Sequence, residues 1–508
     1  MSPGQNHNLY HLFERACPPD GASLLLQTPT GDSYSYADVK RESARLANYL
    51  IALGARPGDR VTVQVEKSPR VLCLYLACLR AGLVYHPLNT AYQASELTYF
   101  LGDARPRIVV CAGHSAALFE SLAGGAGVET VCTLEADGSG SLSAGAAECP
   151  SAFETVVCGP GDQAALLYSS GTTGRPKGIM LTHANLASNG LSLVKIWGFT
   201  PADVLLHALP VFHVHGLFVA INCVLLSGAR MLWLDKFDAA EVTAVLPRCS
   251  VMMGVPTYYT RLLAEPAFGR ESCEHMRLFI SGSAPLLAET FREFQQRTGH
   301  TILERYGMSE TGMNTSNPLH GERRAGTVGL PLPDVELRVV DASGQQLPPG
   351  EAGDLQVRGP NVFPGYWQMP EKTREDFTDD GFFNTGDKAC QAPDGYVSIV
   401  GRAKDMIICG GLNVYPKEIE QALDGIEGVS ESAVIGVPHA DFGEAVVAVI
   451  VPEDGATLDE ADIIEFSREQ MANFKVPKRI YFQTELPRNA MGKVQKNLLR
   501  ERYRDSFA

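Results

Sequence analysis

Apolar and polar residues alternate with two different periods through the first half of this chain. Arg60 to Val65 and Arg107 to Cys111 are short apolar runs rich in β-branched residues, which is typical of buried strands. Arg70 to Ala81 instead repeats its apolar residues at helical spacing. Strands and helices that alternate in this way indicate a layered α/β protein of stacked sheets and helices.

The pattern changes in the second half. Between Gly329 and Val400, short strand-like runs are separated by Gly and Pro, which predicts an antiparallel sheet or a small barrel. After the segment Gly401 to Gly411 come a helix (Pro416 to Leu423), a strand (Ser432 to Gly436) and a basic tail. This last part is typical of a separate small α/β domain.

Chain length agrees with this division, because 508 residues exceed what one hydrophobic core usually organises. We therefore expect an α/β fold. Residues 1–402 should form a large N-terminal domain with a small barrel-like subdomain, and residues 403–508 a smaller C-terminal α/β domain. One compositionally biased stretch, Glu135 to Glu148, is rich in Gly, Ser and Ala and predicts a surface loop.

Charge and cysteine content narrow the class of protein. The formal net charge of -15 argues against broad binding to nucleic acid or to anionic membranes. The cysteines are scattered from Cys17 to Cys409 without a CxxC pair or a Cys/His cluster, so we expect reduced thiols and no zinc. No run reaches the roughly 18 apolar residues of a membrane span, and the start lacks a signal-peptide pattern. The expected location is the cytoplasm.

A loop from Tyr168 to Gly178 combines glycines and hydroxyl side chains directly after an apolar strand-like run. Glycines permit close approach of the backbone, and hydroxyl and N–H groups donate to anionic oxygens, so the loop can bind phosphates. It is not a Walker A loop, because Lys177 follows Arg-Pro and is not part of G-K-[ST]. A plain Ser/Gly linker is the alternative.

Together with four further blocks, this loop resembles the adenylate-forming superfamily, which contains acyl-CoA synthetases, peptide-synthetase adenylation domains and firefly-type luciferases. The blocks occur in the order expected of that superfamily and extend over most of the chain. They are Tyr306 to Gly312, Thr385 to Asp387, Gly401 to Asp405 and Pro487 to Lys493. The resemblance implies ATP-dependent activation of a carboxylic acid, followed by transfer of the acyl group to coenzyme A.

That chemistry needs positive charge, because a carboxylate must attack the α-phosphorus of ATP and pyrophosphate must leave. The resemblance assigns Glu310 to Mg²⁺ and Thr311 to the phosphates. It assigns Lys493 to a bridge between the acyl carboxylate and the α-phosphate. Without the motif, Glu310 would be read as a surface residue and Lys493 as a solvated lysine of the basic tail.

The resemblance also implies a nucleotide site, a hinge and a modification. Tyr306 should stack on adenine, Asp387 should receive the ribose hydroxyls with help from Arg402, and Lys404 should be the hinge about which the C-terminal domain moves. The remaining cofactor-binding residues are Ser169, Ser170, Gly171, Thr172, Thr173, Gly174, Lys177, Glu304, Gly307, Gly410 and Gly411. Lys493 is further expected to be a target of a lysine acetyltransferase and a deacylase.

Stretches around His207 to Gly216, Gly254 to Arg261 and Ser281 to Pro285 resemble malonyl-CoA synthetases in particular. The resemblance implies that Arg261 and Ser283 hold the far carboxylate of malonate. Recognition by Arg suits malonate, because its single methylene offers little apolar surface. The implied acid-binding residues are Arg261, Ser283, His213, Gly282 and Met308.

Other readings stay open. Arg261 could be an exposed residue of an amphipathic helix, and Gly312 could widen the acid pocket enough for methylmalonate. The protein could also activate another small carboxylic acid or load a carrier protein. Carrier-loading domains commonly place an Asp near the block Phe212 to His215, and this sequence lacks it.

Overall fold

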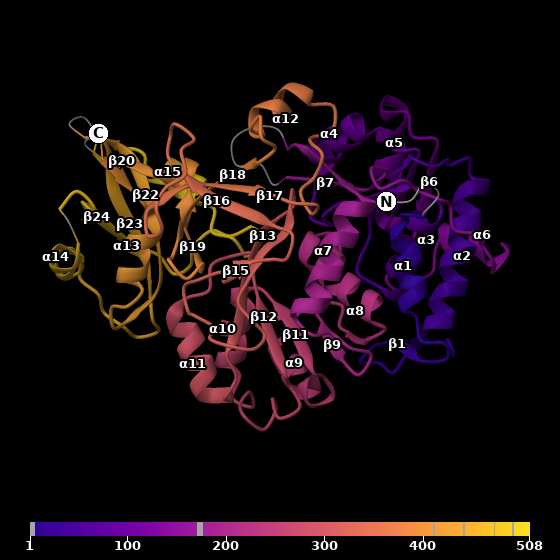
Figure 1. The fold of residues 1–508 in the computed structure, drawn as a ribbon, viewed down its shortest axis with the longest axis horizontal. Coiled ribbons are helices and arrows are strands. Elements are labelled where there is room, and N and C mark those ends of the chain that lie inside the picture. The colour runs from indigo at the N-terminus through magenta and orange to yellow at the C-terminus, as the bar shows by residue number, and fades with distance from the viewer. Residues whose placement is uncertain are drawn as a thin grey trace.

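The computed structural model of the protein describes residues 6–169, 176–409, 412–439, 442–471, 473–489 and 492–507. Figure 1 shows a large N-terminal region built on several sheets and a smaller C-terminal region at one end of the molecule. The mixed α/β fold class predicted from the alternating periods is confirmed.

One sheet of the N-terminal region has six strands. The strands are β3 (Arg60–Gln64), β4 (Val84–Pro87), β5 (Ile108–Cys111), β6 (Thr130–Thr133), β7 (Gln163–Tyr168) and β8 (Gly178–Thr182). The helix α3 (Pro69–Arg80) connects β3 to β4. The strand order is β6-β5-β3-β4-β7-β8, and only β7 and β8 pair antiparallel. Every α3 residue from Val71 to Arg80 is buried, so this helix lies inside the core.

A second sheet has nine strands. They are β1 (Leu24–Gln27), β2 (Ser33–Ser35), β9 (Val204–His207), β10 (Arg230–Trp233), β11 (Val251–Gly254), β12 (Leu278–Ser281), β13 (Ile302–Met308), β14 (Gly312–Ser316) and β15 (Leu330–Pro331). The order is β15-β14-β13-β12-β11-β9-β10-β1-β2, with β9 to β13 parallel. Their carboxyl ends therefore meet at one edge, where α/β sheets usually bind ligands.

Helices cover these sheets and share one large core between them. Figure 1 places α3 beside α1 and α2, with α7 and α8 nearer the second sheet. The helices are α1 (Leu9–Ala16), α2 (Tyr36–Ala52), α4 (Ala94–Ala104), α5 (Ala116–Ala126), α6 (Ser141–Ala147), α7 (His183–Ile196), α8 (Asn222–Ser227), α9 (Ala239–Val245), α10 (Pro256–Ala264), α11 (Ala288–Thr298) and α12 (Pro370–Asp376).

A buried lysine ties the two sheets together. Lys67 follows β3, and its Nζ donates to the backbone carbonyls of His207 at 2.8 Å and Leu234 at 2.5 Å. Nζ also lies 4.5 Å from the ring centre of Trp233, and burial lowers the pKa of Lys67 well below its usual value. His207 stacks on Trp233, and its Nε2 lies 2.9 Å from the carbonyl oxygen of Gly216. These contacts hold the carboxyl ends of β9 and β10 against the segment that follows β3 of the six-stranded sheet.

The third sheet is antiparallel and has four strands, which resolves the choice between a sheet and a barrel for this region. The strands are β16 (Glu336–Val340), β17 (Ala352–Arg358), β18 (Phe383–Gln391) and β19 (Val397–Arg402). They lie in sequence order, with β16 and β19 at the two ends of the sheet.

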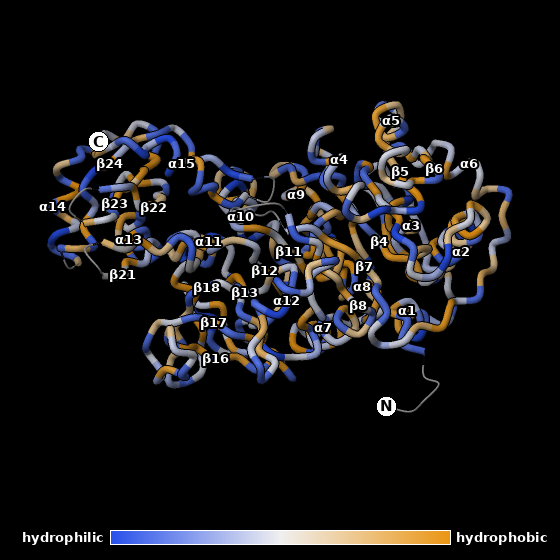
Figure 2. Tube along the Cα trace, turned by 90° about the horizontal axis from the view of Figure 1, so that it is seen from above, coloured by the Kyte–Doolittle hydropathy of each residue, from blue (hydrophilic) through white to orange (hydrophobic). Residues whose placement is uncertain are grey.

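The C-terminal region has its own sheet with an apolar cluster on each face. Its elements are β20 (Ile407–Cys409), β21 (Leu412–Val414), α13 (Pro416–Leu423), β22 (Val429–His439), β23 (Gly443–Pro452), α14 (Glu460–Gln470), β24 (Arg479–Phe482) and α15 (Lys496–Arg502). Figure 2 shows this region as a separate lobe with α13, α14 and α15 around the sheet. The predicted helix at residues 416–423 is confirmed as α13.

One prediction from composition is wrong. The stretch Glu135 to Glu148 is not a loop throughout, because it contains the helix α6. Leu142 and Ala146 lie one helical turn apart and are buried in the main core, which stabilises a helix despite the small residues around them. Among the described residues, no helix is long and apolar enough to cross a bilayer.

Candidate active site

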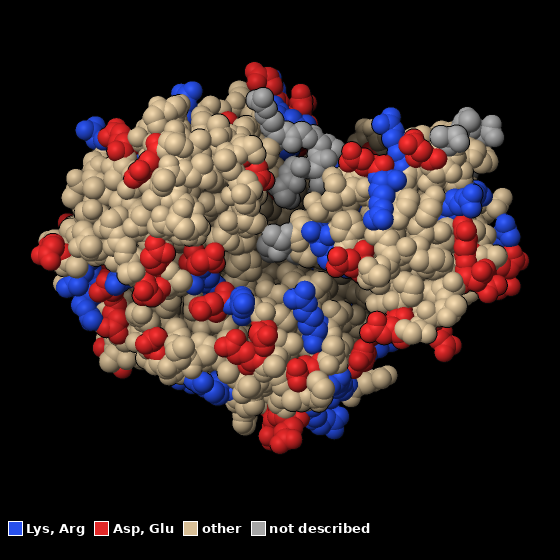
Figure 3. All heavy atoms as spheres, turned by 180° about the vertical axis from the view of Figure 1, so that it is seen from behind, with Lys and Arg blue, Asp and Glu red and all other residues tan. Residues whose placement is uncertain are grey.

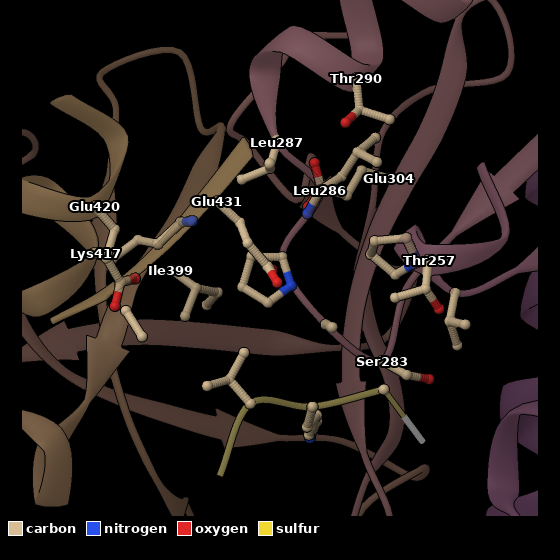
Figure 4. A pocket seen from close by; sticks show the side chains of 18 of the residues that line it. Thr257, Ser283, Leu286, Leu287, Thr290, Glu304, Ile399, Lys417, Glu420 and Glu431 are labelled. Carbon is tan, nitrogen blue, oxygen red and sulfur yellow. The ribbon is translucent and has the colours of Figure 1, made fainter. Parts of the chain in front are cut away.

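A cavity of about 520 Å³ lies between the N-terminal region and the C-terminal lobe. Thr257, Ser283 and Glu304 line it from the N-terminal side, and Lys417 and Glu420 line it from the lobe, as Figure 4 shows. Figure 3 shows the molecule hollowed between its two parts, with acidic and basic side chains mixed over the face in view. A site built from both parts can assemble or come apart when the lobe moves.

Lys493 lines this cavity from the lobe. The loop that carries it touches the N-terminal region, because a Cβ added at Gly492 would lie 3.3 Å from Thr257 Oγ1. Burial lowers the pKa of His213 to about 3, with smaller contributions from the charges of Lys493 and Arg305. Lys493 and His213, which are far apart in the sequence, thus lie close enough in the fold for their charges to interact.

Tyr306 and Asp387 also meet in the cavity. The Tyr306 hydroxyl donates to Asp387 Oδ2 at 2.5 Å, and Asp387 is 4% exposed. Asp387 pairs with the backbone of Arg402 across β18 and β19, while the side chain of Arg402 lies outside the described residues. The residues predicted for adenine and ribose are therefore neighbours, as a nucleoside requires.

Glu304 lies beside this pair on β13. Its Oε1 accepts the backbone N–H of Leu286 at 3.1 Å, while Oε2 is buried without a partner among the described residues. Burial raises the pKa of Glu304 to about 7, and Lys417 and the Leu286 N–H oppose that shift. This unpaired oxygen can accept a hydrogen bond from a ligand in the cavity.

Glu310 and Thr311 lie in the turn between β13 and β14, and both are buried. Thr311 is fixed by Asn314 Nδ2, which donates to its Oγ1 at 2.8 Å, and by Asn361 Nδ2, which donates to its carbonyl at 2.7 Å. The described residues contain no group of three or more His, Cys, Asp or Glu that could hold a metal. Glu310 alone still fits Mg²⁺, which commonly takes one or two carboxylates together with phosphate oxygens.

The predicted phosphate loop is described only at its two ends. Ser169 accepts the backbone N–H of Lys177 at 3.0 Å, which closes the neck of the loop. Lys177 Nζ lies 3.0 Å from the Tyr366 hydroxyl and 3.5 Å from Asp376, and Lys177 does not line the cavity. Outside the described residues lie Ser170, Gly171, Thr172, Thr173, Gly174, Gly410 and Gly411.

Ser283, one of the residues predicted to bind the acid, lies on the cavity wall beside His215. Its backbone adopts a left-handed φ of 72°, and its Oγ lies 3.2 Å from His215 Nδ1. Met308 and Ser283 line the cavity and are half-buried, whereas Arg261 is exposed on α10 at the cavity rim. His215 is completely buried, and burial together with nearby Arg305 lowers its pKa well below the usual value.

Arg305 is a cavity residue that the sequence analysis did not single out. It is 3% exposed, and its Nε and Nη2 have no hydrogen-bond partner among the described residues. Its guanidinium lies against Gly282, where an added Cβ would come within 2.4 Å of Arg305 Cζ. No signal in the sequence singles it out, because Arg305 adjoins Glu304 and only the fold shows that both side chains are buried.

Gly312 does not line the large cavity. It has a left-handed φ of 57°, and a Cβ added there would lie 2.6 Å from Asn189 Oδ1. It borders a separate water-sized space beside α7. The idea that Gly312 widens the acid pocket is therefore wrong, because its missing side chain accommodates Asn189.

The fold and the shared cavity define a two-part α/β enzyme that builds its site from a large domain and a smaller lobe. The chain belongs to the AMP-binding enzyme family: residues 14–367 match the family itself, and residues 418–493 match the AMP-binding enzyme C-terminal domain.

Several relatives extend over nearly the whole chain. A feruloyl-CoA synthase from an Amycolatopsis species is 36% identical, covering 93% of this chain and 94% of its own. The mitochondrial malonate–CoA ligase of Mus musculus is also 36% identical, covering 92% and 87%. ATP-bound MatB from Rhodopseudomonas palustris is 54% identical, with a TM-score of 0.97 and coverage of 99% and 100%. Apo MatB gives a TM-score of 0.87, so this chain resembles the ATP-bound arrangement more.

The raised pKa of Glu304 predicts a pH-dependent effect on stability. Because the folded pKa of about 7 exceeds the ordinary 4.5, the ionised carboxylate destabilises the fold progressively as pH rises through this range. The free energy of unfolding of Glu304→Gln, measured relative to that of the parent, should therefore be higher at about pH 8 than at about pH 5, by up to about 3 kcal/mol. Thermal unfolding at the two pH values measures this difference.

Exposed Glu271 supplies the matched control, since Glu271→Gln removes a carboxylate that is already solvated. An equal stability difference between Glu304→Gln and parent at both pH values would contradict a buried, proton-binding Glu304.

Proposed function

We propose that this protein is a malonate–CoA ligase. It joins malonate to the AMP part of ATP with release of pyrophosphate, and then transfers the malonyl group to the thiol of coenzyme A with release of AMP. ATP and coenzyme A are cosubstrates, and Mg²⁺ is the metal cofactor. The observation that carries the choice of acid is the buried guanidinium of Arg305 at the cavity wall.

The two curated relatives at 36% identity do not choose the acid between them. The relatives named for malonate and for the feruloyl group are equally similar to this chain. The site does discriminate, because a buried charge without a partner is costly and an anionic substrate removes that cost. Malonate brings a second carboxylate one methylene from the reacting one, whereas an aromatic acid such as ferulate brings none.

Arg305 fits such a carboxylate geometrically. A guanidinium presents N–H groups in a planar fork that matches the two oxygens of a carboxylate, and Nε and Nη2 of Arg305 are both unpaired among the described residues. Ser283 lies on the cavity wall beside His215, and its hydroxyl can add a hydrogen-bond donor. Gly282 makes room for the guanidinium.

Arg261 has a different part in this proposal. It lines the rim and is exposed, so solvent screens its charge and its contribution to binding is smaller. It can still attract dianions toward the cavity, because charges at the mouth of a cleft raise the local concentration of oppositely charged ligands. The far carboxylate is thus held by Arg305 and Ser283, with Arg261 outside.

Adenylation depends on Lys493. Its ammonium group bridges the reacting carboxylate of malonate and the α-phosphate, which reduces their repulsion as the new bond forms. His213 stays neutral beside it, because its pKa is lowered to about 3. Glu310 would hold Mg²⁺, which would supply positive charge for the leaving pyrophosphate. Tyr306 and Asp387 hold the nucleoside.

Transfer to coenzyme A requires the lobe to move. The proposal includes a domain boundary near residues 402 and 403 and rotation near Lys404, which is exposed in the short turn Ala403–Asp405 between β19 and β20. Rotation withdraws Lys493 and brings the segment that contains Gly410 and Gly411 toward the adenylate. A cytoplasmic location is also proposed, and the twelve free cysteines suit a reducing compartment.

Lys493→Ala tests the first half of the reaction. We expect pyrophosphate release to fall by at least ~10²–10³, because one transition-state charge is lost. Thioester formation from supplied malonyl-adenylate should be largely retained, since Lys493 has left by then. Lys195→Ala, which removes an exposed lysine on α7, should behave like the parent. Pyrophosphate release at the parent rate in Lys493→Ala would refute the assignment.

Arg305→Gln tests the choice of acid in a pyrophosphate-release panel of malonate, methylmalonate, acetate, succinate and ferulate. The parent should prefer malonate or methylmalonate. In the variant, kcat/KM for malonate should fall by the equivalent of about 2–5 kcal/mol, whereas kcat/KM for acetate should change little. Only malonate has a second carboxylate that loses its desolvated partner. Arg261→Gln should lose less. A parent that favours ferulate, or an Arg305→Gln variant with unchanged malonate kcat/KM, would rule out this binding mode.

Modification of Lys493 by an acetyltransferase, reversed by a deacylase, is a further part of the proposal. The side chain is exposed on a loop, and acylation removes its charge. Chemical acetylation should block pyrophosphate release in proportion to the acetylated fraction of Lys493 measured by mass spectrometry, and a deacylase should restore it. Loss of activity that does not follow the modification of Lys493 would count against this regulation.

A further inference from the structure

Around Lys493, residues 487–489 and 492–495 pair with each other through backbone hydrogen bonds and form the two arms of a hairpin. The backbone N–H of Gln495 donates to the Pro487 carbonyl at 2.7 Å, and that of Asn489 donates to the Lys493 carbonyl at 2.9 Å. The Lys493 N–H donates in turn to Asn489 Oδ1 at 3.0 Å. Gly492 completes the turn with a left-handed φ of 74°. These bonds fix the shape of the hairpin but not its direction relative to the lobe.

Arg488 joins this hairpin to the body of the lobe. Its Nη1 donates to the Gly492 carbonyl at 2.6 Å, next to Lys493, and its Nη2 forms an ion pair with Glu431. Glu431 lies on β22, and burial raises its pKa although the charge of Arg488 opposes that shift. Both Arg488 and Glu431 line the cavity and are only partly exposed.

We propose that Arg488 is a positioning residue for adenylation: held by Glu431, its guanidinium fixes the Gly492 carbonyl and thereby directs Lys493 into the cavity. The inference rests on the proposed function, because it needs Lys493 to act on the acid and ATP. A lysine side chain is flexible, so its charge is useful in the transition state only if its backbone is held in one orientation.

The position of these groups makes the effect specific to one half of the reaction. Arg488, Glu431 and Lys493 all belong to the lobe and move with it as one unit. Loss of the contact therefore leaves the movement of the lobe unchanged. It alters only the direction of Lys493, which matters while the cavity holds malonate and ATP.

A competing explanation is that Arg488 binds the triphosphate of ATP directly, since it lines the cavity. The two explanations differ in what Glu431 does. If Arg488 directs Lys493, removing the Glu431 charge loosens the hairpin and slows adenylation. If Arg488 binds phosphate, removing Glu431 frees the guanidinium and strengthens ATP binding.

The experiment measures malonate-dependent exchange of pyrophosphate into ATP, and separately thioester formation from supplied malonyl-adenylate, for Arg488→Gln, Glu431→Gln and the double variant. We expect kcat for exchange to fall roughly 10- to 100-fold in each single variant with little change in the KM for ATP, as misplacement by about an ångström would cause. The double variant should lose no more than either single one, and Arg488→Lys should recover part of the rate. Thioester formation should stay close to the parent rate, which also shows that the variants are folded.

Arg468→Gln is the matched control, because Arg468 forms an exposed ion pair with Glu465 on α14 of the same lobe and does not line the cavity. A raised KM for ATP in Arg488→Gln with a lowered one in Glu431→Gln would overturn the proposal in favour of phosphate binding. Equal loss in both half-reactions would overturn it in favour of a general structural role. If the parent exchanges pyrophosphate only with another acid, the proposed substrate fails, and the same variants are compared with that acid.

Discussion

Positive charge held away from water is the constraint on which this site depends. Arg305 keeps its guanidinium in the interior with two nitrogen atoms that no described group accepts from. His213 and His215 lie close by and stay neutral, because burial and the neighbouring cations lower their pKa values. The cavity is therefore preorganised for an anion. The packing of the two surrounding sheets offsets the free-energy cost of burying the positive charge.

Packed sheets make only one wall of the cavity rigid. Parallel strands end together at the cavity, and Lys67 joins the ends of β9 and β10 to the neighbouring sheet. The opposite wall belongs to the lobe, which has its own core and contributes Lys493, Lys417 and Glu431. Under the proposed function, the acid is selected in the large domain, while Lys493, the charge that activates it, arrives with the lobe and leaves again.

Local signals made much of this predictable from sequence. Helical spacing indicated α3 and α13, and ordered motifs indicated Tyr306 and Lys493, because each signal lies within a few consecutive residues. Arg305 escaped because neighbouring charged residues on β13 look alike in a sequence, and only the fold shows that both are buried. The contact of Arg488 with Glu431 joins residues 57 positions apart and depends on how the lobe packs.

Substrate choice can change in such a fold without a change in chemistry. Gly282 and Arg305 are coupled, since a side chain at position 282 would occupy the space of the guanidinium. Under the proposed binding mode, a larger, uncharged acid requires the loss of the Arg305 charge and gains the volume it filled, while Lys493 and Glu310 keep their proposed tasks. Under the same proposal, relatives of equal similarity can be named for acids as different as malonate and ferulate, because a few positions around one buried charge would decide between them.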